Sequence, residues 1–127
     1  MNALVINRDR APAEALAEIL AAGGFEPVCL ASYDDALDHI LNKGAAMVFA
    51  PAFCESSDIA IFISKIRSFE DTAKSKTPVI CVSNVPMENF FENACELDVF
   101  GYIEKPVSAP EVIIVARKAA YFMLTGV

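Results

Sequence analysis

The residues of this 127-residue chain that could take part in chemistry directly follow short apolar runs. Asn7, Arg8 and Asp9 come after the first run, and Ser83 and Lys105 come after two later ones. If the runs are parallel strands, these residues meet at the carboxyl ends of the strands, where open α/β sheets place their sites. Two cations, Arg8 and Lys105, would then border one pocket that could bind a small anion.

The four cysteines, Cys29, Cys54, Cys81 and Cys95, show neither CxxC nor CxxH spacing. We therefore expect free thiols rather than disulfides or zinc ligands. Cys29 and Cys81 fall within apolar runs and are predicted to be core residues. Cys54 follows a run and is a candidate redox switch, a role that requires an exposed thiol with a depressed pKa. The sequence has no nucleotide loop of the GxxxxGK or GxGxxG type, so nucleotide chemistry has little support.

The runs alternate with segments of helical spacing along the whole chain. This alternation predicts a three-layer α/β domain, with a five-stranded parallel sheet of order 2-1-3-4-5 flanked by five helices. The predicted strands are residues 3–6, 27–31, 46–50, 79–82 and 100–103, and the predicted helices have their first turns near residues 12, 33, 56, 86 and 110. Ser32 is a predicted N-cap, and Gly23-Gly24 should end the first helix.

Composition limits the possible partners. The net charge is −7 and the basic residues do not cluster, so nucleic-acid binding is not expected. No apolar run reaches the roughly 18 residues of a membrane span, and the first residues lack the basic region of a secretory signal. We therefore expect one cytoplasmic domain, residues 1–127, that does not bind a membrane.

The sequence resembles the receiver domains of response regulators, which act in bacterial two-component signalling. The strongest match is Gly101-Tyr102-Ile103-Glu104-Lys105-Pro106, which is similar to the family's fifth strand and its Lys-Pro pair. Ser83 matches the family's strand-end hydroxyl, and Tyr102 matches its switch aromatic. The resemblance covers essentially the whole chain and implies the flavodoxin-like receiver fold.

The acidic positions depart from the family pattern. In receivers an acidic pair after strand 1 holds Mg²⁺, and an aspartate that ends strand 3 accepts the phosphoryl group. Here Asn7 and Arg8 occupy the acid-pair positions, only the next residue, Asp9, is acidic, and Pro51 occupies the acceptor position. Arg8 puts a fixed cation where the family binds a metal. We expect no phosphorylation, no bound metal or cofactor, and no enzymatic activity, with Ser83, Tyr102 and Lys105 as retained switch residues.

If Arg8 lies at the phosphoryl-binding pocket that the receiver resemblance implies, it has two potential acidic partners, because an unpaired cation there is costly. These are Asp9 and Glu55.

The C-terminal helix is apolar almost all round and is predicted to need a second partner surface. Val112, Val115 and Ala119 can cover the sheet. That leaves four outward interface candidates on this helix, joined by two from the helix near residue 86: Ile113, Ile114, Tyr121, Phe122, Phe90 and Phe91.

The resulting interpretation is an atypical receiver domain. It would act by phosphorylation-independent contact with a protein partner or a second copy, through the helix at 86–95, the strand at 100–103 and the last helix. Two alternatives are a sensor of small anions or ligands at the Arg8/Lys105 pocket and a redox switch at Cys54.

Overall fold

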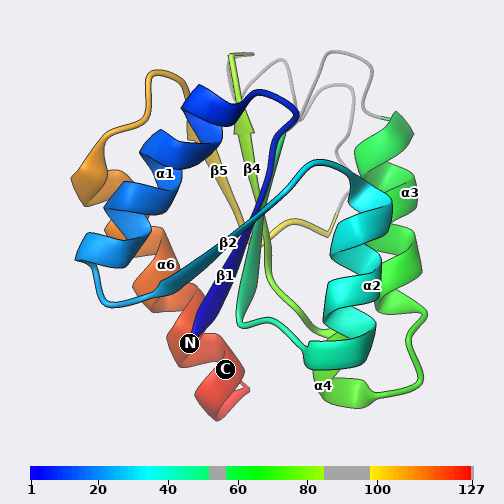
Figure 1. Ribbon diagram of the computed structural model, residues 1–127. Helices are drawn as coiled ribbons and strands as arrows, with labels where there is room; N and C mark the ends of the chain where they lie inside the picture. The colour runs from blue at the N-terminus through cyan, green and yellow to red at the C-terminus, as the bar shows by residue number, and fades with distance from the viewer. Residues whose placement is uncertain (52–56, 85–97, 127) are drawn as a thin grey trace.

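The computed structural model describes residues 1–51, 57–84 and 98–126. Its five parallel strands form one sheet in the order β2-β1-β3-β4-β5 (Figure 1). They are β1 (Asn2–Ile6), β2 (Glu26–Leu30), β3 (Met47–Pro51), β4 (Val79–Ser83) and β5 (Gly101–Glu104). The predicted fold class and strand order are confirmed. Each strand begins or ends within a residue or two of its predicted position.

Helices cover both faces of the sheet, with α1 and α6 on one side and α2 and α3 on the other (Figure 1). They are α1 (Arg10–Ala22), α2 (Tyr33–Lys43), α3 (Ser57–Arg67), the short α4 (Thr72–Ser75) and α6 (Ala109–Thr125). The sequence analysis did not predict α4. The helix predicted at 86–95 lies outside the described residues.

Local capping explains where these helices begin and end. Ser32 Oγ accepts the Asp35 backbone N–H at 3.1 Å, so the predicted N-cap of α2 is confirmed. Asp71 caps α4 in the same way, accepting from the Lys74 N–H at 3.1 Å. At its other end α1 stops at Gly23, and Gly24 follows with a φ of +91°, a conformation that glycine adopts without strain.

The strands are apolar because both of their faces are buried. One face packs Leu4 and Val48 against α2 and α3, and the predicted inner face of α3 is buried there: Ile59, Phe62, Ile63 and Ile66. The other face packs Val5 and Phe49 against α1 and α6. Phe49 and Phe62 are each only 1% exposed, and each contributes about 2 to 3 kcal/mol of burial free energy.

Cys29 is the residue for which the core prediction is wrong. Its side chain is exposed, because β2 is an edge strand that has no neighbour beyond it in the sheet. The thiol lies 3.9 Å from the Ala13 carbonyl of α1. Cys81, on the interior strand β4, is fully buried as predicted.

The buried face of α6 consists of small side chains that allow close approach to the sheet. Val112, Ala116 and Ala119 are fully buried. A Cβ built on Gly101 of β5 would lie 2.8 Å from Val115 Cγ2, so this glycine permits the contact between helix and strand. Val115, predicted to cover the sheet, is half-buried there.

Two interface candidates on α6 pack within the fold. Ile113 lies against the end of α1, where a Cβ on Gly23 would clash with its Cδ1 atom. Phe122 stacks on Phe100, with 5.7 Å between the ring centroids. The expectation that Ile113 and Phe122 lack a partner inside the fold is therefore wrong, because α6 crosses both α1 and the residue before β5.

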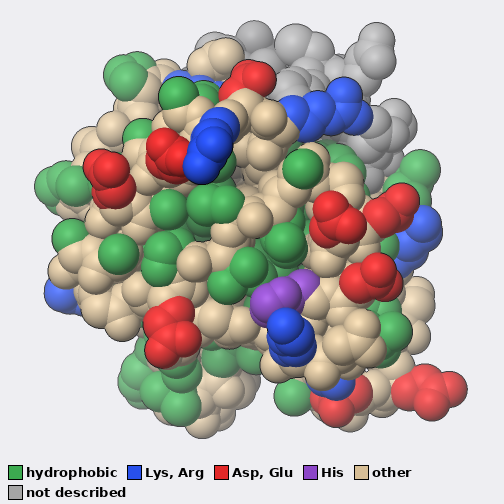
Figure 2. Space-filling model, in the orientation of Figure 1, with side chains coloured by type: hydrophobic (Ala, Val, Ile, Leu, Met, Phe, Trp, Pro, Cys, Tyr) green, Lys and Arg blue, Asp and Glu red, His purple; other side chains and the backbone are tan. Residues whose placement is uncertain are grey.

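Other apolar side chains of α6 remain exposed. Ile114, Tyr121 and Leu124 are 54%, 62% and 73% exposed. The end of α6 extends past the sheet, and hydrophobic side chains gather there at the bottom of the space-filling view (Figure 2). No helix in the described part of the chain is long and apolar enough to cross a membrane.

Arg67, at the end of α3, ties three segments together. Its Nη1 donates to the carbonyls of Ser75 and Thr77 at 3.0 and 2.8 Å, and its Nε lies 2.7 Å from Asp98 Oδ2. The guanidinium thus joins α3 to the turn that precedes β4 and to the segment that precedes β5. This contact fixes how the two strands enter the sheet.

We predict that Arg67→Ala lowers the free energy of unfolding by about 2 to 3 kcal/mol, because it leaves the backbone carbonyls of Ser75, Thr77 and Asp98 without their charged donor. Asp98→Ala is the control. It removes an acceptor that is 73% exposed, so it should cost only about 0.5 kcal/mol. Urea unfolding followed by circular dichroism measures both values. Equal losses in the two variants would show that the ion pair, and not the backbone contacts, carries the stability.

Candidate functional site

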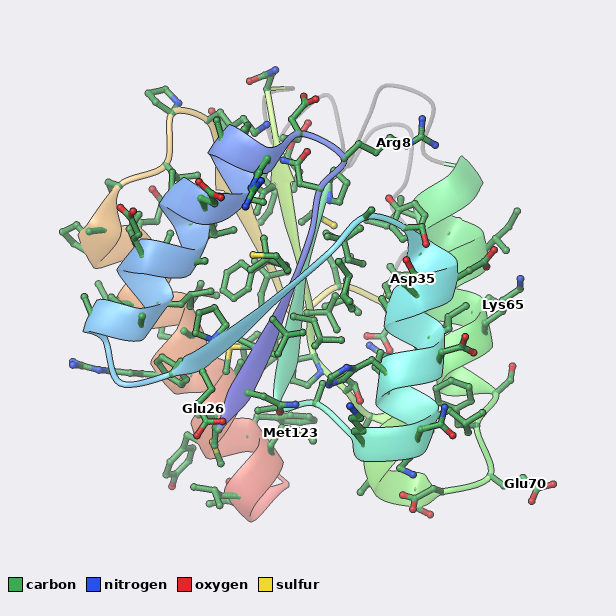
Figure 3. The ribbon with its side chains drawn as sticks, in the orientation of Figure 1. Arg8, Glu26, Asp35, Lys65, Glu70 and Met123 are labelled. Atoms are coloured by element: carbon green, nitrogen blue, oxygen red, sulfur yellow. The ribbon has the colours of Figure 1, made fainter. Side chains whose placement is uncertain are left out.

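The β1–α1 loop brings three candidate residues to the carboxyl edge of the sheet. Asn7 is half-buried, and its backbone N–H donates to the Leu30 carbonyl at 3.0 Å. Arg8 and Asp9 are exposed. The Arg8 side chain extends across the top of the view, away from the strands (Figure 3). Asp9 stands at the N-cap position of α1, but its carboxylate makes no capping hydrogen bond.

Pro51 is the last residue of β3, at the centre of this edge. It pairs with Val82 of β4, and its carbonyl accepts a hydrogen bond from the Tyr33 hydroxyl at 2.8 Å. The Tyr33 ring packs against Phe62 of α3, with 4.8 Å between centroids. The position that matches the acceptor aspartate of receivers therefore holds a proline, whose side chain has no ionisable group. The backbone carbonyl of this proline accepts a hydrogen bond from a tyrosine.

Sequence reasoning missed Tyr33. The N-cap at Ser32 places Tyr33 in the first turn of α2, directly after β2, so the edge on which it lies could be predicted. Its contact with a residue 18 positions away could not, because that contact depends on how α2 packs beside β3.

The three proposed switch residues lie on β4, on β5 and just after β5. Ser83 and Tyr102 are 3% and 8% exposed, and Tyr102 is part of the core beneath α2 and α3. The Lys105 N–H donates to the Ser83 carbonyl at 2.8 Å, so the backbone links the two strand ends. The Lys105 side chain is exposed at the edge, and the Lys105–Pro106 peptide bond is cis.

Arg8 and Lys105 border the same groove, as the sequence analysis expected. The groove has a volume of about 760 Å³ and runs between the β1–α1 loop, the start of α2 and α3. Lys65 of α3 adds a third cation, and Asp9 and Asp34 add two carboxylates. Among the described lining residues the charge is therefore mixed, with three cations and two carboxylates.

The expected ion pair between Arg8 and Asp9 is not found in the structure. Arg8 makes no ion pair with Asp9 or with any other residue in the ranges 1–51, 57–84 and 98–126. Its other expected partner, Glu55, lies outside these ranges. Arg8 avoids the desolvation cost of a buried cation because it is exposed to water.

The residues at this edge do not fit the Mg²⁺ ion that the receiver resemblance implies. Mg²⁺ prefers octahedral coordination by carboxylates, carbonyls and water. Asn7 Oδ1 already accepts the Asp9 N–H at 2.9 Å, Arg8 is a cation and Pro51 has no side-chain oxygen. Among the described residues, no group of three or more His, Cys, Asp or Glu could hold a metal ion.

The two described cysteines lack the depressed pKa of a reactive thiol. Burial raises the pKa of Cys81 to about 12. Partial burial and the Glu14 carboxylate raise the pKa of Cys29. Raised values keep both thiols protonated at neutral pH and make them poor nucleophiles. Cys54, the redox candidate, and Cys95 lie outside the described residues.

Comparison with known proteins places this fold among receivers. No family model and no curated protein sequence matches the chain. Solved structures do match, among them a sensor protein from Polaromonas sp. JS666 with 24% identity, coverage of 96% of this chain and 97% of that chain, and a TM-score of 0.81. A CheY-like response regulator receiver domain from Methylobacillus flagellatus has 24% identity, coverage of 94% and 98%, and a TM-score of 0.76.

The same fold also occurs within a longer protein. NtrX from Brucella abortus matches with 22% identity and a TM-score of 0.79, over 98% of this chain but only 27% of that chain. At these identities the likeness establishes the fold, which is that of response regulator receiver domains.

We predict that Mg²⁺ does not change the melting temperature of this protein, because Arg8 and Pro51 supply no ligand. The double variant Arg8→Asp/Pro51→Asp puts two carboxylates near Asp9 and should gain a Mg²⁺-dependent rise in melting temperature. Differential scanning calorimetry with and without Mg²⁺ measures both. Submillimolar Mg²⁺ binding by the unmodified protein, mapped to Asp9, would contradict this account of the site.

Proposed function

We propose that this chain is an atypical receiver domain that signals without accepting a phosphoryl group. The observation that carries the proposal is Pro51 at the end of β3, between the ends of β1 and β4. Phosphoryl transfer in receivers needs a nucleophilic carboxylate at this position and a divalent ion to offset the negative charge that gathers there. A proline side chain cannot act as the nucleophile, and Arg8 disfavours the ion. The domain acts as a non-enzymatic module of a two-component pathway.

The output of such a module is contact with another protein, and the exposed stripe of α6 supports this role. Ile114 and Tyr121 lie seven residues apart on one side of the helix, with Lys118 between them. Monomeric proteins leave single apolar residues exposed, but an apolar row beside charged residues is typical of a contact surface. Phe90 and Phe91, the other proposed members of the surface, lie outside the described residues.

The charges along this stripe are arranged so that it could bind the same stripe of a second copy of the chain. Glu111, Ile114, Lys118 and Tyr121 follow one another at helical spacing, so an acidic and a basic residue flank Ile114. If two α6 helices cross antiparallel at Ile114, Glu111 of each copy lies opposite Lys118 of the other. Two-fold dimers bring such self-complementary patches together. The dimer forms through α6 and its neighbours on the β5 side of the sheet.

We predict that acetyl phosphate and Mg²⁺ leave the intact mass of this protein unchanged, because the acceptor carboxylate is missing. Electrospray mass spectrometry detects the added phosphoryl group as an increase of about 80 Da. A receiver that retains the acceptor aspartate serves as the positive control in the same reaction. An adduct on this chain, mapped by peptide sequencing to the end of β3, would contradict the proposal.

We also predict that Ile114→Asp/Tyr121→Asp yields a folded monomer, whereas the unmodified chain forms a dimer at high concentration. Buried carboxylates without partners would cost the interface several kcal/mol. Sedimentation velocity over a concentration series measures the association. Ile61→Asp is the matched control, because Ile61 is also 54% exposed but lies on α3. A monomeric unmodified chain, or a dimer that Ile61→Asp dissociates, would reject the α6 interface.

A further inference from the structure

A second cavity, of about 480 Å³, adjoins the charged groove on the α1 side of the sheet and shares Asn7, Asn84 and Lys105 with it. Its floor is formed by Val5, Phe49 and Val82 at the carboxyl ends of β1, β3 and β4. Leu16 and Ala15 of α1 line one wall. Ala15 is exposed, whereas the floor residues Val5, Phe49 and Val82 are almost completely buried.

The rim of this cavity is polar. Lys105, Asn7 and Asn84 line it, and no Asp or Glu is among its described lining residues. Binding sites for small molecules commonly measure about 300 to 1,000 Å³ and combine apolar walls with a few convergent polar groups. This cavity has that size and that composition. The ammonium and amide groups of the rim favour an anion, and the apolar walls favour a ligand with a hydrocarbon part.

We propose that the cavity binds a small amphipathic carboxylate, with its apolar part on Val5, Phe49 and Val82 and its carboxylate at Lys105. An ammonium group and amide N–H groups are the donors that a carboxylate requires. The apolar walls supply most of the affinity, because an exposed lysine alone contributes little binding energy in water. The neighbouring groove is less suited to an anion, since Asp9 and Asp34 offset its cations.

The site has a direct connection to the residues proposed as the switch. Lys105 donates its backbone N–H to the Ser83 carbonyl, so a ligand that orders Lys105 also acts on the end of β4. The proposal does not depend on the α6 interface, so the two can fail separately.

Sodium octanoate is the first probe, with 1-octanol as its uncharged counterpart and inorganic phosphate as an anion without an apolar part. In ¹H–¹⁵N correlation spectra of the full chain, octanoate should cause saturable shifts centred on Val5, Leu16 and Val82. Octanol should shift the same residues more weakly. Phosphate should not shift them.

Two variants and a control locate the ligand. Ala15→Phe fills the cavity from the exposed side of α1 and should abolish octanoate binding, whereas Ala21→Phe, on the same helix but outside the cavity, should leave it unchanged. Lys105→Gln should weaken octanoate binding about fivefold and leave octanol binding unchanged. The proposal is overturned if octanoate gives no saturable shifts, if Ala15→Phe still binds it, or if phosphate shifts the same residues as strongly.

Discussion

Pro51 ends β3 at the centre of the sheet, and the chemistry open to this edge depends on that residue. Its side chain has no ionisable group and no hydrogen-bonding atom, so neither nucleophilic attack nor metal coordination can start from it. Its carbonyl is bound by the Tyr33 hydroxyl at 2.8 Å, which joins the start of α2 to the end of β3. At this position the backbone thus makes a structural contact between helix and strand.

The surroundings of Pro51 are also unlike a site for a divalent cation. Arg8, Lys65 and Lys105 line a groove whose described residues include two carboxylates, Asp9 and Asp34, whereas an acidic pocket that binds Mg²⁺ needs the opposite balance. On the α1 side of the sheet, Val5, Phe49 and Val82 form an apolar floor next to Lys105. An edge of this composition favours an amphipathic anion over a hydrated divalent cation. The buried Ser83 and Tyr102 remain adjacent to it through β4 and β5.

Much of the fold could be predicted because periodicity and capping are local signals. The inner face of α3, the cap at Ser32 and the stop at Gly23 all follow from residues within a few positions of one another. Cys29 was misplaced because an apolar residue in a strand was assumed to be covered, although the predicted order already put this strand at the edge. The Arg67 contacts could not be predicted, since they join residues brought together only by tertiary packing. For the same reason Ile113 and Phe122 were predicted to lie at an interface. In the structure Ile113 packs against Gly23, and Phe122 packs against Phe100.

We propose that Ser83, Tyr102 and Lys105 do not respond to a phosphoryl group in this protein. Fluoroberyllate, which mimics a phosphoryl group bound to an aspartate, tests it directly when it is titrated with Mg²⁺ and followed by ¹H–¹⁵N correlation spectra. Without an acceptor carboxylate at position 51, the account predicts that the amide resonances of Ser83, Tyr102 and Lys105 stay where they are. Saturable, Mg²⁺-dependent shifts of these three resonances would contradict it.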